Sequence, residues 1–206
     1  AHGALVIIDE THTQSTGHGG YTKTFGLDPD IFVIGKCVAG GLPTALWGLR
    51  PDLATRFATY NATRPPGHSG MGTTLSANPL QFAALLATLT QVATPTALAK
   101  MERGAQRLAT GLSCAIAAHG APWHVVRVGA RVEFICAPGP LRNGFEAARA
   151  HAPEVEAVTH LALLNRGSLI APFHNMMLVS PVTTRAQIDR LVANFHAVLG
   201  MLFSKD

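Results

Sequence analysis

Two short apolar runs lie near the start of the chain, at residues 5–8 and 31–34. Each run is too short for a core helix and contains β-branched residues, so both are predicted to be buried strands that lie parallel in one sheet. The pattern that follows predicts a third strand and three helices, at residues 45–49, 51–57, 80–92 and 95–119. This order of elements predicts an α/β fold with a mainly parallel sheet.

The second half of the chain has a different pattern, with shorter elements of both kinds. Strands are expected at residues 124–128, 132–136, 169–171 and 177–180, and helices at residues 143–150, 154–165 and 185–203. These elements predict a small α+β unit. We therefore divide the chain into residues 1–94, part of a large α/β domain, and residues 95–206, a small C-terminal domain.

Each of the two leading strands is followed by a charged residue. Asp9 follows the first run and Lys36 follows the second, and open α/β sheets bind ligands at the carboxyl ends of their strands. The two residue types suit pyridoxal phosphate, because a lysine amine forms a Schiff base with an aldehyde and a carboxylate keeps the pyridine nitrogen protonated. A buried Asp–Lys ion pair that only braces the strands would explain the same pattern.

Three segments carry a family resemblance: IIDETHT, PDIFVIGKCVAGGLP and GTTLSANPL. They resemble motifs of class III pyridoxal-phosphate aminotransferases of fold type I, nearest the branch that contains glutamate-1-semialdehyde aminomutase. The resemblance implies that Asp9 binds the pyridine nitrogen and that Lys36 carries the Schiff base. It also implies that Thr74 reaches the phosphate of the neighbouring subunit's cofactor. Thr73 stands where relatives commonly have Gly, and it is expected to share this role.

The resemblance suggests further contacts to the cofactor and the substrate. Thr11 is expected to pack on the face of the cofactor ring, where many relatives have Val, and His12 to lie near the ring's 3-hydroxyl. Several relatives present an arginine to the substrate carboxylate from the region that corresponds to residues 171–176. This chain has His174 and Asn175 there instead, which suggests weaker carboxylate binding or a different substrate class. Arg131, which follows the small residues Gly129 and Ala130, could clamp a carboxylate or serve only a structural purpose.

Charge and cysteine content argue against several other partners. The formal net charge is +4, from 16 basic and 12 acidic side chains, and no basic run predicts binding to nucleic acid or to a membrane surface. The 3 cysteines form no CxxC pair, and no third ligand accompanies His12 and His18, so neither a disulfide framework nor a metal site is expected. We interpret Cys37 as a packing residue and expect a soluble protein in the reducing cytoplasm, because no secretory signal or membrane-spanning run occurs.

The resemblance also exposes a gap before Asp9. Fold type I enzymes hold the phosphate with a turn at a helix start and stack the ring on an aromatic residue, and both elements precede the strand that ends on the aspartate. The residues before Asp9 are too few to supply them. We therefore expect the N-terminal portion of the same enzyme, or a second chain, to be required. The family further implies a homodimer with shared active sites.

Two classes of function follow from these observations. The first is an aminotransferase that moves an amino group from a small amino donor to a keto or aldehyde acceptor, with an aminomutase, racemase or decarboxylase as a weaker variant. The second is a catalytically silent homologue or an interaction fragment that retains Asp9 and Lys36 only as an ion pair.

Overall fold

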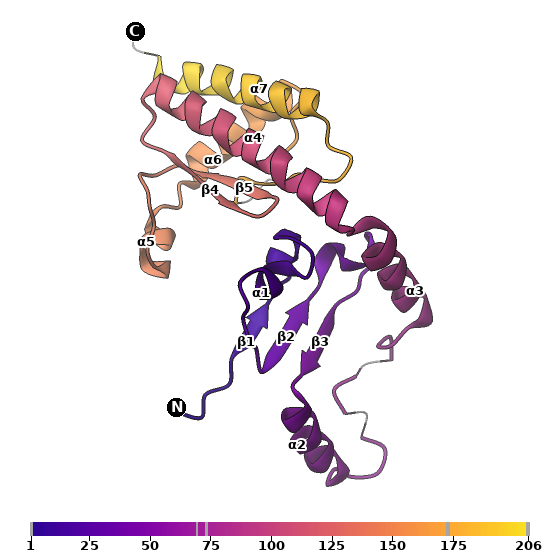
Figure 1. The fold of residues 1–206 in the computed structure, drawn as a ribbon. Coiled ribbons are helices and arrows are strands. Elements are labelled where there is room, and N and C mark those ends of the chain that lie inside the picture. The colour runs from indigo at the N-terminus through magenta and orange to yellow at the C-terminus, as the bar shows by residue number, and fades with distance from the viewer. Residues whose placement is uncertain (1, 69, 73, 172–173, 205–206) are drawn as a thin grey trace. The chain divides into compact units, whose positions relative to one another are not determined.

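The structure is a computed structural model that describes residues 2–68, 70–72, 74–171 and 174–204. The chain divides into two compact units, Ala1–Ala97 and Leu98–Asp206, and their elements are labelled in Figure 1. The division falls in the first turn of helix α4 (Pro95–His119), just after the boundary expected at residue 94. The assignment of the units as a cofactor-binding domain and a small domain stays a prediction.

The first unit contains a 3-stranded sheet in the order β1-β2-β3. Its strands are β1 (Ile7–Asp9), β2 (Ile31–Ile34) and β3 (Leu46–Leu49). Strand β1 pairs parallel with β2, with Asp9 opposite Val33, whereas β3 pairs antiparallel with β2. The predicted parallel pair is therefore confirmed, and both of its strands end at the same edge of the sheet (Figure 1).

The prediction that these two strands are buried is wrong for this chain. Ile7 is 62% exposed, and every residue of β2 is only half-buried. The physical reason is that β1 has a strand neighbour on one side only within the described residues. An apolar strand at the edge of such a small sheet leaves much of its surface open.

Short helices and turns surround this sheet. They are the 3₁₀ turn η1 (Thr13–Ser15), α1 (Gly20–Thr24), the 3₁₀ turn η2 (Lys36–Ala39), α2 (Pro51–Ala62), α3 (Pro79–Ala87) and the π turn η3 (Thr88–Val92). Helices α2 and α3 begin with proline, which has no N–H to leave unpaired. Helix α2 runs past the predicted end at residue 57. Thr55 and Thr59 turn their hydroxyls back onto the carbonyl oxygens of Pro51 and Thr55, so these residues do not interrupt the helix.

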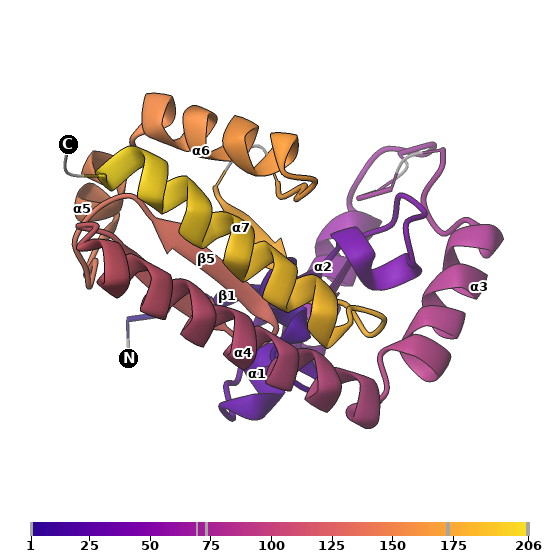
Figure 2. The ribbon, with the colours of Figure 1, turned by 90° about the horizontal axis from the view of Figure 1, so that it is seen from above.

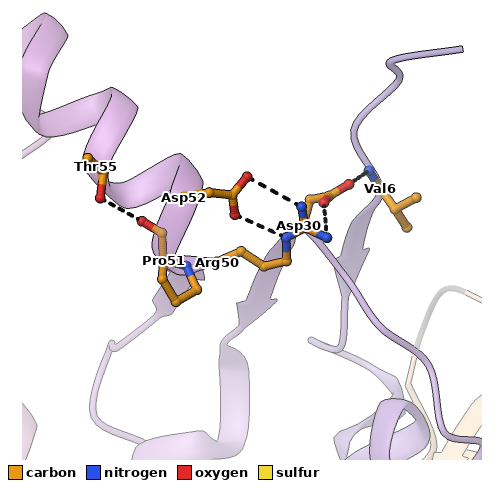
Figure 3. Close-up of polar contacts among 6 residues, drawn as sticks. All are labelled: Val6, Asp30, Arg50, Pro51, Asp52 and Thr55. Carbon is orange, nitrogen blue, oxygen red and sulfur yellow. Dashed lines mark hydrogen bonds and ion pairs between the residues drawn. The ribbon is translucent and has the colours of Figure 1, made fainter. Parts of the chain in front are cut away.

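A polar cluster joins the three strands at the ends opposite to the Asp9 end, and Figure 3 shows its residues. Asp30, just before β2, accepts a hydrogen bond of 2.7 Å from the backbone nitrogen of Val6 and forms an ion pair of 3.0 Å with Arg50, which follows β3. Asp52 contacts Arg50 in turn, with 3.3 Å between Nε and Oδ1. Because these residues flank all three strands, the cluster fixes the register of the sheet.

The second unit is an α+β structure, as the sequence predicts. Its antiparallel sheet contains β4 (His124–Val128), β5 (Arg131–Ile135) and β6 (Met176–Leu178), and its helices are α4, α5 (Gly144–Arg149), α6 (Pro153–Asn165) and α7 (Arg185–Phe203). The strand predicted at residues 169–171 does not form. Ile170 enters the core while Leu169 is 77% exposed, and no strand of the described chain pairs with this segment.

Helices α4 and α7 lie side by side over one face of this sheet (Figures 1 and 2). They approach closely at Gly111, where an added Cβ would stand 2.6 Å from a methyl carbon of Val192. Between these helices and the sheet, Trp123, Phe134 and Phe195 of α7 form the aromatic centre of the core, with the Phe134 and Phe195 ring centroids 4.8 Å apart. Full burial of such side chains stabilises the fold by about 1.5–3 kcal/mol each.

By length and apolar content, no single helix in the described part of the chain could cross a membrane; only the bent pair Pro79–Val92 and Pro95–His119 meets these criteria when taken together.

Candidate functional site

Asp9 and Lys36 lie at the carboxyl ends of the neighbouring parallel strands β1 and β2. Asp9 is the last residue of β1 and pairs with Val33, and Lys36 begins the turn that follows β2. The Glu10 backbone nitrogen continues the pairing with a 2.7 Å bond to the Val33 carbonyl. The parallel register therefore brings the carboxylate and the amine to neighbouring strand ends, as expected for a ligand site in an open α/β sheet.

The Asp9 carboxylate is kept in its charged form by Thr11. The Thr11 hydroxyl and its backbone N–H both bond the carboxylate and lower the pKa of Asp9, with 2.8 Å from the backbone nitrogen to Oδ1. Desolvation of the carboxylate opposes this shift, and the nearby His12 and Lys36 side chains lower the pKa further. A charged carboxylate of this kind fits the protonated nitrogen of a pyridine ring.

Lys36 occupies an unusual backbone conformation. Its φ is 55°, in the left-handed region, and its side chain is exposed. A residue with a Cβ in this conformation costs about 1–3 kcal/mol and persists only where the surroundings hold it, and such residues cluster at functional sites. The buried residues Gly35, Val38 and Ala39 flank Lys36 and anchor its turn.

The alternative of a buried Asp–Lys ion pair does not match this geometry. Asp9 and Lys36 are both exposed, and none of the ion pairs of the described chain joins them within 4.0 Å. The Lys36 amine is thus available to a ligand. The packing role expected for Cys37 is also wrong, because β2 ends at Ile34 and Cys37 lies exposed on the turn.

Glu10 is a further part of this site, to which sequence reasoning gave no role. Its side chain is 0% exposed. It accepts hydrogen bonds of 2.6 Å from the Thr13 hydroxyl and 3.0 Å from the Tyr21 backbone nitrogen, and another from the Thr22 backbone nitrogen. Burial raises the pKa of Glu10, but these bonds together outweigh burial and lower it below the ordinary value. The carboxylate thereby closes the loop that follows Asp9.

Gly20 makes this arrangement possible. It has a φ of +71°, and a Cβ at this position would lie 2.7 Å from Glu10 Oε2. Sequence reasoning assigned the glycines here only to a loop. The available signal for Glu10 was its position directly after the strand-end aspartate.

Gln14 is a second residue that sequence reasoning missed. Its Nε2 donates to the Gly35 carbonyl at 2.8 Å and to the Thr11 carbonyl at 3.1 Å. The side chain therefore bridges the segment after β1 and the segment after β2. No local sequence signal predicts this contact, because its partners are far apart in the chain.

Of the two residues predicted to bind the phosphate, the structure describes only Thr74. Thr74 is exposed and precedes α3, whose first residues are capped by Asn78 through a 2.9 Å bond to the Leu80 nitrogen. Thr73 lies outside the described residues. The free N–H groups at the start of a helix suit a phosphate, but the roles of Thr73 and Thr74 stay predictions.

The substrate candidates lie on strand β5 and just before its neighbour β6 in the second unit. Arg131 begins β5 and pairs with Leu178 of β6, and its guanidinium lies 3.0 Å from the Met176 sulfur. His174 and Asn175 come directly before β6, and both have left-handed backbone conformations, with φ of 68° and 44°. Asn175 is buried and His174 is exposed. Two strained residues in sequence are typical of a functional segment.

Glu133 belongs to the same strand face as Arg131. It is half-buried, and burial raises the pKa of its carboxyl; the nearby His174 opposes this shift and Glu156 adds to it. Residues two positions apart on a strand point to the same side.

Among the described residues, no group of three or more His, Cys, Asp or Glu side chains could hold a metal ion.

Comparisons with solved structures give the same fold. A glutamate-1-semialdehyde-aminomutase from Pseudomonas aeruginosa PAO1, solved also as a lysine-to-alanine variant in complex with PMP, is 42% identical, with a TM-score of 0.91 over 97% of this chain and 45% of the other. A β-phenylalanine aminotransferase from Variovorax paradoxus is 28% identical, with a TM-score of 0.83 over 97% of this chain and 45% of the other. The chain thus has the fold of part of a fold type I pyridoxal-phosphate enzyme.

Sequence comparisons agree with the structural ones. A glutamate-1-semialdehyde 2,1-aminomutase from Desulforudis audaxviator (strain MP104C) is 32% identical over 99% of this chain, and one from Sorangium cellulosum (strain So ce56) is 34% identical over 93%. The chain spans 46% and 43% of these two relatives, less than half of their length. The family model for class-III aminotransferases matches residues 1–199. The chain therefore belongs to the class-III aminotransferase family, whose members depend on pyridoxal phosphate.

Proposed function

We propose that the complete protein is a pyridoxal-phosphate-dependent aminotransferase in which Lys36 is the amine that binds the cofactor covalently. The observation that carries this proposal is that a charged Asp9 and an exposed Lys36 lie at the neighbouring carboxyl ends of parallel strands, and that no ion pair among the described residues involves Lys36. Family membership supports the same chemistry.

The residues of the site fit the cofactor. Pyridoxal phosphate supplies an aldehyde that reacts with amines and a ring that accepts electrons when its nitrogen is protonated. Asp9 would hold the proton on that nitrogen, and the bonds from Thr11 keep Asp9 charged for this purpose. The Lys36 amine, once an incoming amino donor has released it, would move a proton between the substrate carbon and the C4′ carbon of the cofactor.

An aminomutase is the second candidate, and a specific observation favours it. The relatives from Desulforudis audaxviator and Sorangium cellulosum are both named glutamate-1-semialdehyde 2,1-aminomutase, whereas the Variovorax paradoxus neighbour is an aminotransferase. The absence of an arginine at residues 171–176 of the sequence supports a substrate whose carboxylate is held differently. The amino donor and the keto or aldehyde acceptor are small molecules in both cases.

The partners of the chain are part of the proposal. The exposed edge strand β1 supports a requirement for the N-terminal portion of the same enzyme. Helix α3 has no buried residue, and Leu80 and Leu86 are 66% and 65% exposed, which supports a homodimer in which this helix lies at the interface. Three free cysteines are consistent with the reducing cytoplasm.

The experiment that tests the function uses the complete protein. Addition of pyridoxal phosphate should produce a visible absorption band, borohydride should remove it, and peptide mapping should find the reduced adduct on Lys36. Assays with an amino acid and a keto acid would then measure aminotransferase activity, and assays with glutamate-1-semialdehyde would measure aminomutase activity. A complete protein that gives no band and no adduct is the silent homologue instead.

A further inference from the structure

Gln14 joins the two segments that carry the candidate catalytic groups. One N–H of its side-chain amide reaches the Gly35 carbonyl at 2.8 Å and the other reaches the Thr11 carbonyl at 3.1 Å. Both partners are acceptors, so the amide nitrogen must face them and both of its protons are used. Gln14 is itself held on η1 by a bond of 2.9 Å from its backbone nitrogen to the Glu10 carbonyl.

The bond to Gly35 acts directly on the backbone of Lys36. The Gly35 carbonyl and the Lys36 nitrogen belong to one planar peptide unit, so a donor that fixes this oxygen also fixes the direction in which the chain enters Lys36. The only other backbone donor to this oxygen among the described residues is the Val38 nitrogen, at 3.4 Å. Gln14 therefore supplies the shorter contact next to the left-handed Lys36.

The bond to Thr11 acts on the other side of the site. Thr11 carries the two groups that lower the pKa of Asp9 most, and its carbonyl is the one that Gln14 binds. A single side chain thus sets the spacing between the loop that holds the Asp9 carboxylate and the turn that begins with Lys36.

We propose that Gln14 is a positioning residue that holds the Lys36 turn against the Thr11 loop. The proposal rests on the proposed function only in that Lys36 is the reacting amine. Gln14 touches neither reacting group; it acts through the Gly35 and Thr11 carbonyls.

The test replaces Gln14 by methionine in the complete protein, which keeps the length of the side chain and removes both donors. Gln106→Met is the matched control, because Gln106 Nε2 donates to one oxygen, the Thr110 hydroxyl, at 3.2 Å in an exposed contact within α4. Gln14→Asn is a second variant for the case in which Gln14→Met fails to fold, since its amide is too short to reach both carbonyls.

Two measurements decide the outcome. We expect Gln14→Met to lower kcat by about 10- to 100-fold, the effect of a small misplacement of a reacting group, with KM for the amino donor within about twofold of wild type. The rate at which added pyridoxal phosphate becomes trapped on Lys36 by borohydride should fall by a similar factor, whereas Gln106→Met should change neither quantity. If Gln14 had only a structural role, Gln14→Met would lower the melting temperature but would not lower kcat while KM stays nearly unchanged.

Failure of this proposal is distinguishable from failure of the proposed function. If wild type is trapped on Lys36 and Gln14→Met or Gln14→Asn shows the same trapping rate and kcat, the positioning role of Gln14 is wrong. If wild type itself is never trapped on Lys36, the proposed function is wrong.

Discussion

Thr11 donates its backbone N–H to Asp9 Oδ1 at 2.8 Å, and its hydroxyl bonds the same carboxylate. The residue expected to pack on the face of the cofactor ring thus has a second task, which is to keep Asp9 ionised. A valine at this place would retain the backbone bond and lose the hydroxyl.

Asp9→Asn should keep the shape of the site and remove its charge. Without the carboxylate the pyridine nitrogen loses the group that keeps it protonated, so we expect kcat of the complete enzyme to fall on the order of a thousandfold, about 4 kcal/mol in the barrier. Steady-state kinetics with saturating cofactor would measure this. Unchanged kinetics would show that Asp9 has only a structural role.

Thr11→Val should raise the pKa of Asp9, because the hydroxyl bond is the largest influence that lowers it. A carboxylate with a higher pKa becomes protonated earlier as the pH falls, so the acid limb of the profile of kcat against pH should move to higher pH. Thr11→Ser retains a hydroxyl and serves as the control. A valine variant whose acid limb coincides with that of the serine variant would contradict the assignment.

Lys36→Ala should abolish turnover while the cofactor still binds without a covalent bond. Asp9 remains charged in this variant, because Thr11 contributes more than Lys36 to the lowering of the Asp9 pKa. Equilibrium dialysis with pyridoxal phosphate, together with an amino-transfer assay, would test both statements. Multiple turnovers at a rate near wild type would remove Lys36 from the mechanism.

Glu10→Gln should destabilise the complete protein by about 1–3 kcal/mol, because an amide N–H would face donors that now bind a buried carboxylate. Chemical denaturation of the cofactor-free protein would measure this, with the exposed Glu154→Gln as control.

The same residue predicts a dependence of stability on pH. The folded pKa of Glu10 is below the ordinary value of 4.5, so its contribution is fully present above about pH 4.5 and is lost as the pH falls through the folded pKa. Wild type should therefore lose more of its free energy of unfolding below pH 4.5 than Glu10→Gln does. Parallel pH profiles for the two proteins would contradict this.

Thr74→Ala should weaken cofactor affinity by about 1–3 kcal/mol if its hydroxyl binds the phosphate of the partner subunit's cofactor. Shared sites also predict complementation between subunits. A mixture of Lys36→Ala with Thr73→Ala/Thr74→Ala chains should form heterodimers in which one site has both defects and the other has none, so activity should return. A fully active monomer in sedimentation experiments would exclude shared sites.

Local patterns were sufficient for much of the secondary structure. The β-branched run at residues 31–34 forms β2 with the predicted bounds, and Pro95 and Gly120 delimit α4 as expected. Thr184 caps α7 through a capping box with Gln187. These signals act within a few residues of one another, so they are present in the sequence whatever the rest of the chain does.

Other features depend on contacts between segments that are distant in the sequence, so local patterns did not predict them. Helix α2 continues past residue 57, and the predicted strand at residues 169–171 lacks a partner. The direction of β3, antiparallel to β2, also depends on pairing rather than on composition. Strand formation is a property of two segments, so one apolar run cannot establish it alone.

The sequence by itself determined the family, the strand ends that carry Asp9 and Lys36, and the division into an α/β and an α+β part. Only the tertiary structure decided that Lys36 is left-handed and exposed, that Glu10 is buried, and that Gln14 bridges the Gly35 and Thr11 carbonyls. The physical reason is that motifs specify residue types along the chain, whereas side-chain hydrogen bonds between strand ends form only after the parallel register has brought distant segments together.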